Sequence, residues 1–259
     1  CDGVVSLYKY IVTGFFWAIL FFLAYYCICS TCFITCDVTE LTFFVEDSAG
    51  RNLLSLAVVV IFFVAAKCAV RLAPVRRFVG RVNEEEAFYR RCRNVLLLII
   101  LGMSVIWVTS TQYQAGDDQY IVQRTAYYLN LRGDTIFTPG EYLDRCHNQI
   151  GLVYLSWLFS MVFGGCNYVA FQLANALGLV WFYRELTEVC GIFQFKNTVR
   201  LTVIGVGILL FPLIMYTSFV YGTILGLACA VAAIKNELLC LEHGSVRRGL
   251  AAGFFITLA

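Results

Sequence analysis

The chain has 259 residues, of which 60% are hydrophobic and 14% are charged, and its mean hydropathy is +0.77. Soluble domains have about 45–50% apolar and about 25% charged residues, so this composition excludes an ordinary soluble domain. The net charge of +2 and the lack of a basic patch with interleaved aromatic residues exclude the usual nucleic-acid-binding class. The chain begins without methionine and stops inside an apolar run, so we expect it to be a fragment of a longer protein.

Long apolar runs predict three membrane-spanning helices in the first part of the chain, within residues 7–36, over 53–70 and over 95–113. A bilayer core about 30 Å thick requires ~20 mainly apolar residues in a helix. An acidic connector follows the first run, and residues 71–93 after the second run contain seven arginines. Short loops rich in Lys and Arg remain in the cytoplasm, so we expect the basic stretch inside and the third span to run outward.

The polar segment 114–149 is the largest hydrophilic region and is predicted to be an external loop. Its first part has apolar residues at helical spacing, which predicts a short amphipathic helix on the membrane surface, ended by Gly133. Pro139 and Gly140 predict a turn, and a second short helical piece should follow it.

Shorter apolar pieces follow this loop and make the later topology inconsistent. If every piece crosses the membrane, the charged connectors 184–200 and 235–248 both lie outside, which the positive-inside bias disfavours. A half-crossing or re-entrant piece would remove the conflict. We predict an all-α polytopic membrane protein, with residues 1–94 as N-terminal spans and basic loop and residues 95–259 as the first part of a transmembrane module.

The twelve cysteines do not predict a metal site. Most lie in apolar runs, where a buried thiol acts as a small apolar side chain. The segment CICSTCFITC has one C-x-C and one C-x-x-C spacing, without a second pair or a nearby histidine. The chain also has no glycine-rich phosphate loop, so we expect no nucleotide cofactor.

Two adjacent aspartates, Asp117 and Asp118, stand just after the third predicted span. The simplest interpretation is that Asp118 caps the surface helix, which is worth about 0.5–2 kcal/mol, and that Asp117 is solvated. Two carboxylates alone are too few for a typical metal site. An outward-facing carboxylate beside the membrane could instead act as a general base toward an acceptor hydroxyl.

The order of several short motifs from residue 95 to residue 233 adds a resemblance to this argument. The motifs are Asp118-Gln119 with Ala126 eight residues after the aspartate, Tyr127-Tyr128, Asn148-Gln149-Ile150-Gly151, and Pro212, Tyr216 and Phe219-Val220-Tyr221-Gly222. In this order the segment resembles membrane glycosyltransferases of the C superfamily, the class of the protein O-mannosyltransferases and aminoarabinose transferases. It is most similar to a bacterial, family 39-like branch of that class.

Two departures from the family pattern concern the loop. Cys146-His147 stands where many relatives have Tyr-Pro before the Asn-Gln pair. Gln119 stands where the eukaryotic enzymes have a second acidic residue, so that acid is missing unless Asp117 replaces it.

The resemblance implies a C-superfamily-like helix bundle with a helical first external loop, in the plasma membrane of a bacterium. It implies transfer of a sugar from a polyprenyl-phosphate donor to a hydroxyl of an envelope glycan, lipid or protein, without a further cofactor. Asp118 is then the catalytic base, and Asp117 is either an auxiliary acid or a solvated neighbour. With one base and no nucleophile pair, inversion at the sugar is expected by analogy with paired-carboxylate glycosyl chemistry.

Seven further residues are candidates for contacts with donor or acceptor: Arg124, Arg132, Arg145, His147, Gln149, Tyr216 and Tyr221. The arginines could stabilise the departing phosphate or anchor in lipid headgroups. The histidine could polarise a substrate or be a structural residue, and the glutamine could order the loop or contact the donor. The tyrosines could line the donor groove or belong to the interfacial aromatic belt.

Two non-enzymatic hypotheses compete with the transferase. A channel or transporter usually carries ionisable groups within its spans, whereas here Lys67 lies near the end of its predicted span. A structural or assembly subunit of a cell-envelope complex would use the outer loop as a docking surface. Asp118 discriminates between these hypotheses, because a docking loop tolerates loss of its charge and a base does not.

Overall fold

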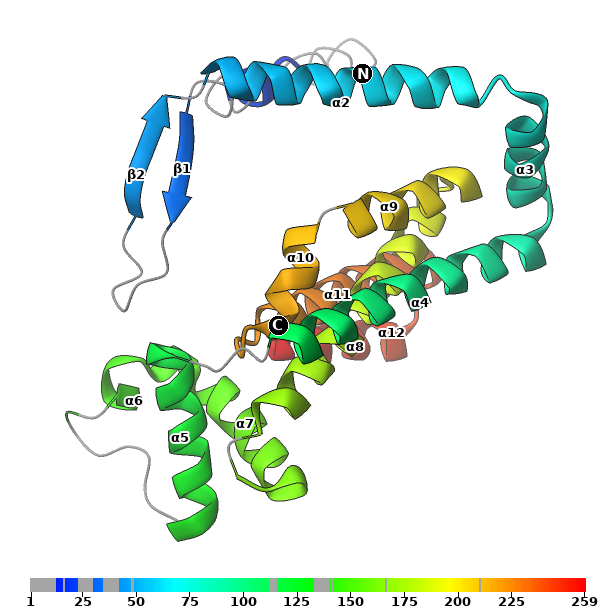
Figure 1. The fold of residues 1–259 in the computed structure, drawn as a ribbon. Helices are drawn as coiled ribbons and strands as arrows, with labels where there is room; N and C mark the ends of the chain where they lie inside the picture. The colour runs from blue at the N-terminus through cyan, green and yellow to red at the C-terminus, as the bar shows by residue number, and fades with distance from the viewer. Residues whose placement is uncertain are drawn as a thin grey trace. The chain divides into compact units, whose positions relative to one another are not determined.

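Helices make up most of the described chain, and one two-stranded hairpin accompanies them (Figure 1). The structure, a computed structural model, describes residues 13–15, 17–22, 30–34, 42–47, 49–111, 116–132, 140, 142–165, 167–209 and 211–259. Contacts divide the chain into two units, Cys1–Arg76 and Arg77–Ala259. Each unit is described by itself.

The N-terminal unit contains the hairpin and one long helix. Strand β1 (Ser30–Ile34) pairs antiparallel with β2 (Thr42–Asp47), and helix α2 (Ala49–Ala69) follows. α2 confirms the helix expected at residues 53–70. At 1.5 Å per residue its 21 residues extend over about 31 Å, the thickness of a bilayer core.

The predicted first span, within residues 7–36, needs a correction. A helix is described over Thr13–Phe22, but the end of the apolar run forms β1 instead of continuing as helix. β1 contains Thr31, Phe33 and Ile34, residue types that fit strands, and β2 supplies its hydrogen-bonding partner. The other residues of the run lie outside the described part.

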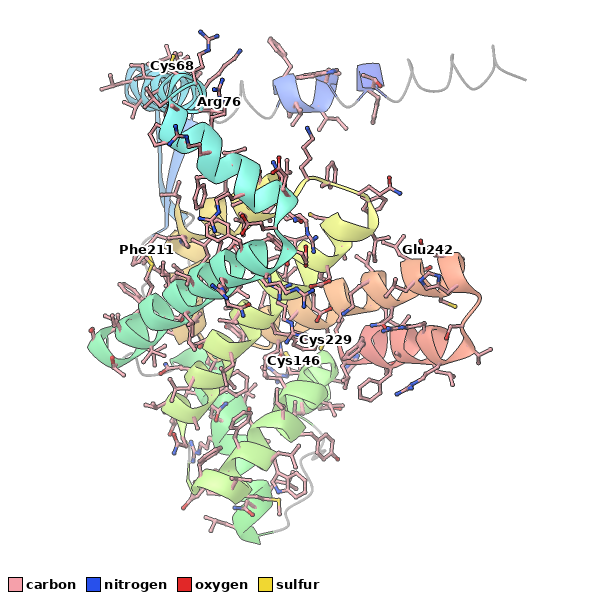
Figure 2. All side chains as sticks on the ribbon, turned by 90° about the vertical axis from the view of Figure 1, so that its right-hand side faces the viewer. Cys68, Arg76, Cys146, Phe211, Cys229 and Glu242 are labelled. Atoms are coloured by element: carbon pink, nitrogen blue, oxygen red, sulfur yellow. The ribbon has the colours of Figure 1, made fainter. Side chains whose placement is uncertain are left out.

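The C-terminal unit is built around a bundle in which α8 packs against α4, α9 and α11, while α12 packs along α11 (Figures 1 and 2). Gly244, with a φ of 63°, ends α11 in the left-handed conformation that suits glycine and lets α12 turn back. The helices are α3 (Ala73–Glu84, which begins in the first unit), α4 (Glu86–Thr111), α8 (Tyr168–Ile192), α9 (Asn197–Leu209), α10 (Phe211–Met215), α11 (Thr223–His243) and α12 (Val246–Leu258).

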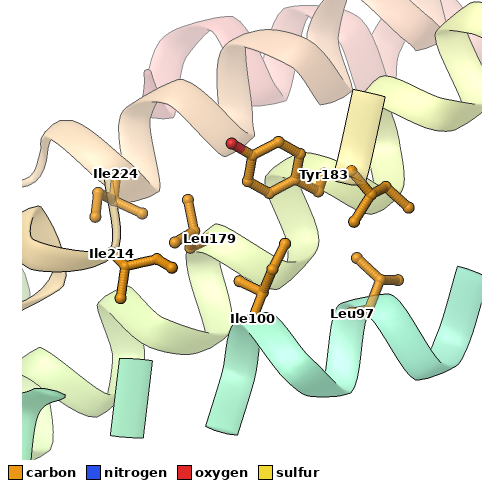
Figure 3. Packing of buried hydrophobic residues seen from close by; sticks show 7 residues of the cluster. Leu97, Ile100, Leu179, Tyr183, Ile214 and Ile224 are labelled. Atoms are coloured by element: carbon orange, nitrogen blue, oxygen red, sulfur yellow. The ribbon is translucent and has the colours of Figure 1, made fainter. Parts of the chain in front are cut away.

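A cluster of buried apolar side chains joins five of these helices (Figure 3). Gly207 of α9 lies against Tyr183 of α8, and a Cβ atom at position 207 would lie 2.3 Å from the ring Cζ. The missing side chain therefore sets how closely α9 approaches α8. The buried members of the cluster are Leu97 and Ile100 of α4, Leu179 and Tyr183 of α8, Ile204 of α9, Ile214 of α10 and Ile224 of α11.

Charged residues gather at one end of the bundle, which we call the basic end. Arg93, near the N-terminus of α4, donates to Glu188, near the C-terminus of α8, at 2.7 Å. Arg200, in the first turn of α9, lies 4.0 Å from the same carboxylate. Lys235, in the second half of α11, pairs with Glu185 of α8. The starts of α4 and α9 and the later halves of α8 and α11 therefore lie together.

Two helices of the described part, α4 and α11, are long and apolar enough to cross a membrane. The number rises to four if each of two bent helix pairs counts as one crossing. The first pair is α7 (Ile150–Phe163) with α8, bent by 115°, and the second is α9 with Phe211–Ser218, bent by 67°. These helices indicate a membrane protein. α4 also confirms the helix expected at residues 95–113, although it begins earlier, at Glu86.

If every apolar piece crossed the membrane, the connectors 184–200 and 235–248 would lie on the opposite side from the start of α4. The structure shows that this arrangement is wrong. Connectors 184–200 and 235–248 meet the start of α4 at the basic end, through the ion pairs described above. α7 and α8 join at a sharp bend where Gly164 and Gly165 have φ values of 74° and 61°. α7 packs mainly against α5 (Asp117–Arg132) rather than against the centre of the bundle. By length and composition, α7 and α8 fit either one broken crossing or a re-entrant piece, as the half-crossing alternative required.

Candidate functional site

The predicted surface helix is present as α5, which is described over Asp117–Arg132, and the expected stop at Gly133 lies outside the described residues. α5 does not lie free on a surface, because one face is buried. Val122 and Ala126 pack with Leu143 of α6 (Tyr142–Arg145) and Val153 of α7. Gln123 strengthens this contact by donating to the Ser156 hydroxyl of α7 at 2.8 Å. α5, α6 and α7 thus form one layer, which we call the α5 layer. The contacts with α6 and α7 hold α5 in place.

Asp118 is exposed in the first turn of α5. The expectation that Asp118 caps this helix is wrong, because Gly116 accepts the first helical hydrogen bond, from the Tyr120 backbone N–H at 3.2 Å. The carboxylate is instead favoured there by the positive end of the helix dipole. The side chain of Asp117 lies outside the described part, so its role stays a prediction.

Gln119, the next residue, is buried and ties the start of α5 to a distant segment. Its Oε1 accepts a hydrogen bond from the backbone N–H of Val220 at 2.7 Å. The two residues are 101 positions apart in the chain. The Asp-Gln and Phe-Val-Tyr-Gly motifs, which the sequence showed only as separate patterns, therefore contact each other.

Val220 belongs to a break between helices, residues 216–222, which we call the broken segment. It consists of a short 3-10 turn, η2 (Tyr216–Ser218), and four non-helical residues before α11. Its carbonyl groups are bound by two amides of α8. Gln172 donates to the Ser218 carbonyl at 2.7 Å, and Asn175 donates to the Thr217 and Phe219 carbonyls at 3.3 and 2.7 Å.

These amides explain how non-helical backbone exists inside an apolar bundle. Buried backbone groups without partners are costly, and irregular backbone at membrane depth occurs where protein groups or a cavity satisfy it. Gln172 and Asn175 are both buried, and they share a face of α8 because they are three residues apart. The segment is therefore fixed from two sides, by α8 and by Gln119 of α5.

The broken segment lies toward the end of the bundle away from the basic end. Trp107, near the C-terminus of α4, donates from Nε1 to the Met215 carbonyl just before η2, at 3.2 Å. Arg93, which marks the basic end, is near the opposite terminus of the same helix. Asp118, the broken segment and the C-terminus of α4 thus share one end, which we call the α5 end.

The structure brings only some of the predicted site residues together. Tyr216 and Tyr221 are on the broken segment, and the Tyr216 ring lies 5.0 Å from that of Phe219. Arg124 is exposed on α5, where its guanidinium lies 5.3 Å from the Tyr128 ring and donates to the Tyr128 hydroxyl at 3.4 Å. This hydrogen bond raises the pKa of Arg124, a side chain that is cationic in any case.

The other predicted residues lie farther along the α5 layer. Arg132 is fourteen residues or about 21 Å along α5 from Asp118, and its side chain lies outside the described part, so its role stays a prediction. Arg145 and His147 are exposed in α6 and in η1 (His147–Gln149), and Gln149 is half-buried before α7. Among the described side chains, none of these three has a hydrogen bond to the start of α5.

Sequence reasoning did not name the two amides of α8 as site residues. Their signal was present as two polar residues, Gln172 and Asn175, within the apolar run YVAFQLANALGLV. Polar residues inside a span usually mark a functional or structural polar contact. The residues that the structure describes include no group of three or more histidine, cysteine or acidic side chains placed to hold a metal ion.

No protein-family model, curated protein or solved structure matches the chain. The likeness to the C superfamily therefore rests on the short motifs themselves, and the activity that it implies stays a prediction.

Replacing Gln119 with leucine is expected to release the broken segment. The Val220 N–H would then be buried without a partner, at a cost of about 1–3 kcal/mol. Hydrogen–deuterium exchange should become faster in peptides that cover residues 219–222. Gln123→Leu is the matched control, since it removes a buried amide of the same helix that contacts α7 instead. Equal exchange in the two variants would contradict this role of Gln119.

Proposed function

We propose that the protein is an integral membrane glycosyltransferase, which transfers a sugar from a polyprenyl-phosphate donor to an acceptor hydroxyl. We place it as a multi-pass protein of a bacterial plasma membrane, acting on the external face. The observation that carries the proposal is the hydrogen bond from Val220 to Gln119. It holds the exposed carboxylate of Asp118 beside a non-helical segment at one end of an apolar helix bundle.

The distribution of charge supports this orientation. The five arginines of residues 77–93, all in the second unit, and the charged ends of α8, α9 and α11 share the basic end. The positive-inside bias then places the basic end in the cytoplasm. α4 would run outward, α7 with α8 inward, α9 with α10 outward and α11 inward. The α5 end, with Asp118, would face outward, where a lipid-linked sugar and an envelope acceptor can meet.

The chemistry assigned to Asp118 is that of a general base. Its carboxylate takes the proton of the acceptor hydroxyl while the acceptor oxygen attacks the anomeric carbon of the sugar. The bond from that carbon to the phosphate oxygen breaks, and the polyprenyl phosphate leaves with the electron pair. Inversion at the anomeric carbon is expected, since the carboxylate acts on the acceptor rather than on the sugar.

The remaining candidates receive roles according to their positions. Tyr216 and Tyr221 lie on the broken segment and are proposed to contact the donor. Arg124, Arg145 and His147 are exposed on the α5 layer, where they can meet a phosphate or a lipid headgroup. Phosphate stabilisation by one of the two exposed arginines fits a donor that approaches from the membrane.

Deleting the gene in its own host tests the proposal. The strain should lose a sugar from one class of envelope glycan, lipid or protein and accumulate the polyprenyl-phosphate sugar, and the wild-type gene should reverse both changes. Mass spectrometry of the envelope and of the lipid fraction measures both. An unchanged envelope with unchanged lipid-linked sugars would contradict the transferase.

A transporter is the second candidate, because transporter sites are often built from broken helices near the middle of the membrane. The broken segment, held by Gln172 and Asn175, is a helix break of this kind, although it lies toward one end of the bundle. The same deletion strain distinguishes the two functions. A transporter mutant accumulates an unmodified solute on one side of the membrane, whereas a transferase mutant accumulates the donor lipid.

A further inference from the structure

A groove of about 500 Å³ lies between α3, α4 and α9, near the basic end and away from the proposed transfer site. This volume is within the range of about 300–1,000 Å³ typical of small-molecule sites. The walls are mostly apolar side chains from three helices. The lining includes Phe78 and Val82 of α3, Val95 and Leu96 of α4, and Leu201 of α9, with Arg91 of α4 as its one cation.

The polar groups of the groove are occupied by the protein, except for Arg91. The Thr198 hydroxyl donates to Asn83 Oδ1 at 2.8 Å, and the Thr202 hydroxyl donates to the Thr198 carbonyl at 2.9 Å. A peptide would find few free hydrogen-bonding partners on such walls. An apolar chain would find a matching surface.

Arg91 differs from its arginine neighbours in forming no ion pair among the described residues, although its charge, after that of Arg81, helps to lower the pKa of Glu85. Arg81 pairs with Glu85 at 3.0 Å, Arg90 pairs with Glu86 at 3.1 Å, and Arg93 pairs with Glu188. Arg91 is exposed at the groove, so its guanidinium is available to an anion. One end of the occupant should therefore be anionic.

The helix α3 places the groove at an interfacial depth. It is amphipathic, with Phe78 and Val82 at the groove and exposed Arg77 and Arg81 on the rest of its surface. Helices of this kind lie at the headgroup level, and basic clusters at the cytoplasmic end of a span attract anionic lipids. The five arginines of residues 77–93 against the three glutamates Glu84–Glu86 supply such a cluster within the same unit.

We propose that this groove binds one anionic phospholipid of the cytoplasmic leaflet, with an acyl chain along the apolar walls and the headgroup phosphate on Arg91. The proposal depends on the membrane orientation given above and not on the transferase chemistry. Asp118→Asn should therefore leave lipid binding unchanged, so that the two proposals can fail separately.

The test uses the full chain, purified in mild detergent, stripped of lipid and mixed with equal amounts of phosphatidylglycerol and phosphatidylcholine. Native mass spectrometry counts the lipids that remain bound. We expect the wild type to retain one phosphatidylglycerol in preference to phosphatidylcholine, and Arg91→Gln to lower this retention at least tenfold. Arg90→Gln is the matched control. It removes the same charge at the neighbouring residue, whose guanidinium forms an exposed ion pair with Glu86.

Thr202→Trp is a second variant, which fills the groove from an exposed position and should reduce the retention of both lipids. The melting temperatures of all variants are compared with that of the wild type. If Thr202→Trp does not fold, Arg91→Gln still tests the proposal, because Arg91 is exposed. Equal retention of the two lipids by the wild type would overturn the proposal. Equal retention by Arg91→Gln and Arg90→Gln would overturn it as well.

Discussion

Lys235→Met is expected to lower the free energy of unfolding by about 3–5 kcal/mol, since it leaves the carboxylate of Glu185 buried without its counter-charge. The exposed fractions of the two side chains are only 19% and 10%. Trp181 donates to the other oxygen of Glu185 at 3.2 Å, which fixes the carboxylate in place. Thermal unfolding of the full chain in detergent, followed by circular dichroism, measures the loss.

The control for this prediction removes both charges at once. Lys235→Met combined with Glu185→Gln should recover most of the lost stability, because neither charge is then left alone. Arg90→Gln, which opens the exposed pair with Glu86, should cost less than about 1 kcal/mol. If Lys235→Met were as mild as Arg90→Gln, the pair between α8 and α11 would not hold the basic end together.

The second large effect is expected for Gly207→Ala, at the contact between α9 and α8. A methyl group at this position would lie 2.3 Å from the Cζ atom and 2.5 Å from the hydroxyl of Tyr183. The Tyr183 ring is 4% exposed and packs in the central cluster, so it cannot move aside freely. Overpacking of this kind typically costs about 1–3 kcal/mol, and the melting temperature should fall accordingly.

A second substitution identifies the cause of this loss. Tyr183→Leu in the Gly207→Ala background removes the ring that the methyl group meets, so it should restore part of the stability. Gly205→Ala is the matched control on the same helix, because a Cβ atom there has no neighbour within 4 Å. Equal losses in the two alanine variants would point to helix propensity instead of the contact with Tyr183.

Helices formed by long apolar runs were the easiest part of the fold to predict. The runs at residues 53–70 and 95–113 became α2 and α4, and the helix expected after Asp118 became α5. A long apolar run has few alternatives to a helix when its backbone groups cannot bond to water. The end of the apolar run before Asp37 forms the strand β1 instead of a helix, because its β-branched and aromatic residues fit a strand and β2 supplies a partner.

The path of the chain after the loop could not be predicted from hydropathy. α7 is as apolar as a spanning helix, but one of its faces covers α5, and hydropathy does not distinguish a protein neighbour from lipid. The sharp bend at Gly164 and Gly165 then lets α8 run through the bundle. The signal in the sequence was the GGCN turn, whose consequence for topology depends on these tertiary contacts.

The motifs of the candidate site could be found in the sequence, but their arrangement in space could not be predicted from it. The sequence marked Asp118-Gln119 and the Phe-Val-Tyr-Gly motif, and only the structure shows that Gln119 binds Val220. It also separates Arg132 from Asp118, because a helix of sixteen residues keeps its two ends apart. Gln172 and Asn175 could not be recognised as part of the site from the sequence, because they are neutral amides in an apolar run and their partners lie more than forty residues away.

The most direct test of the transferase compares Asp118→Asn and Asp117→Asn in the deletion strain, after confirming equal amounts in the membrane. Loss of a general base typically lowers the rate by about 10²–10⁴-fold, so Asp118→Asn should give the envelope glycan profile of the deletion, and Asp117→Asn should retain the wild-type profile. A wild-type profile from Asp118→Asn would show that this carboxylate serves only the start of α5, and would contradict the proposed mechanism.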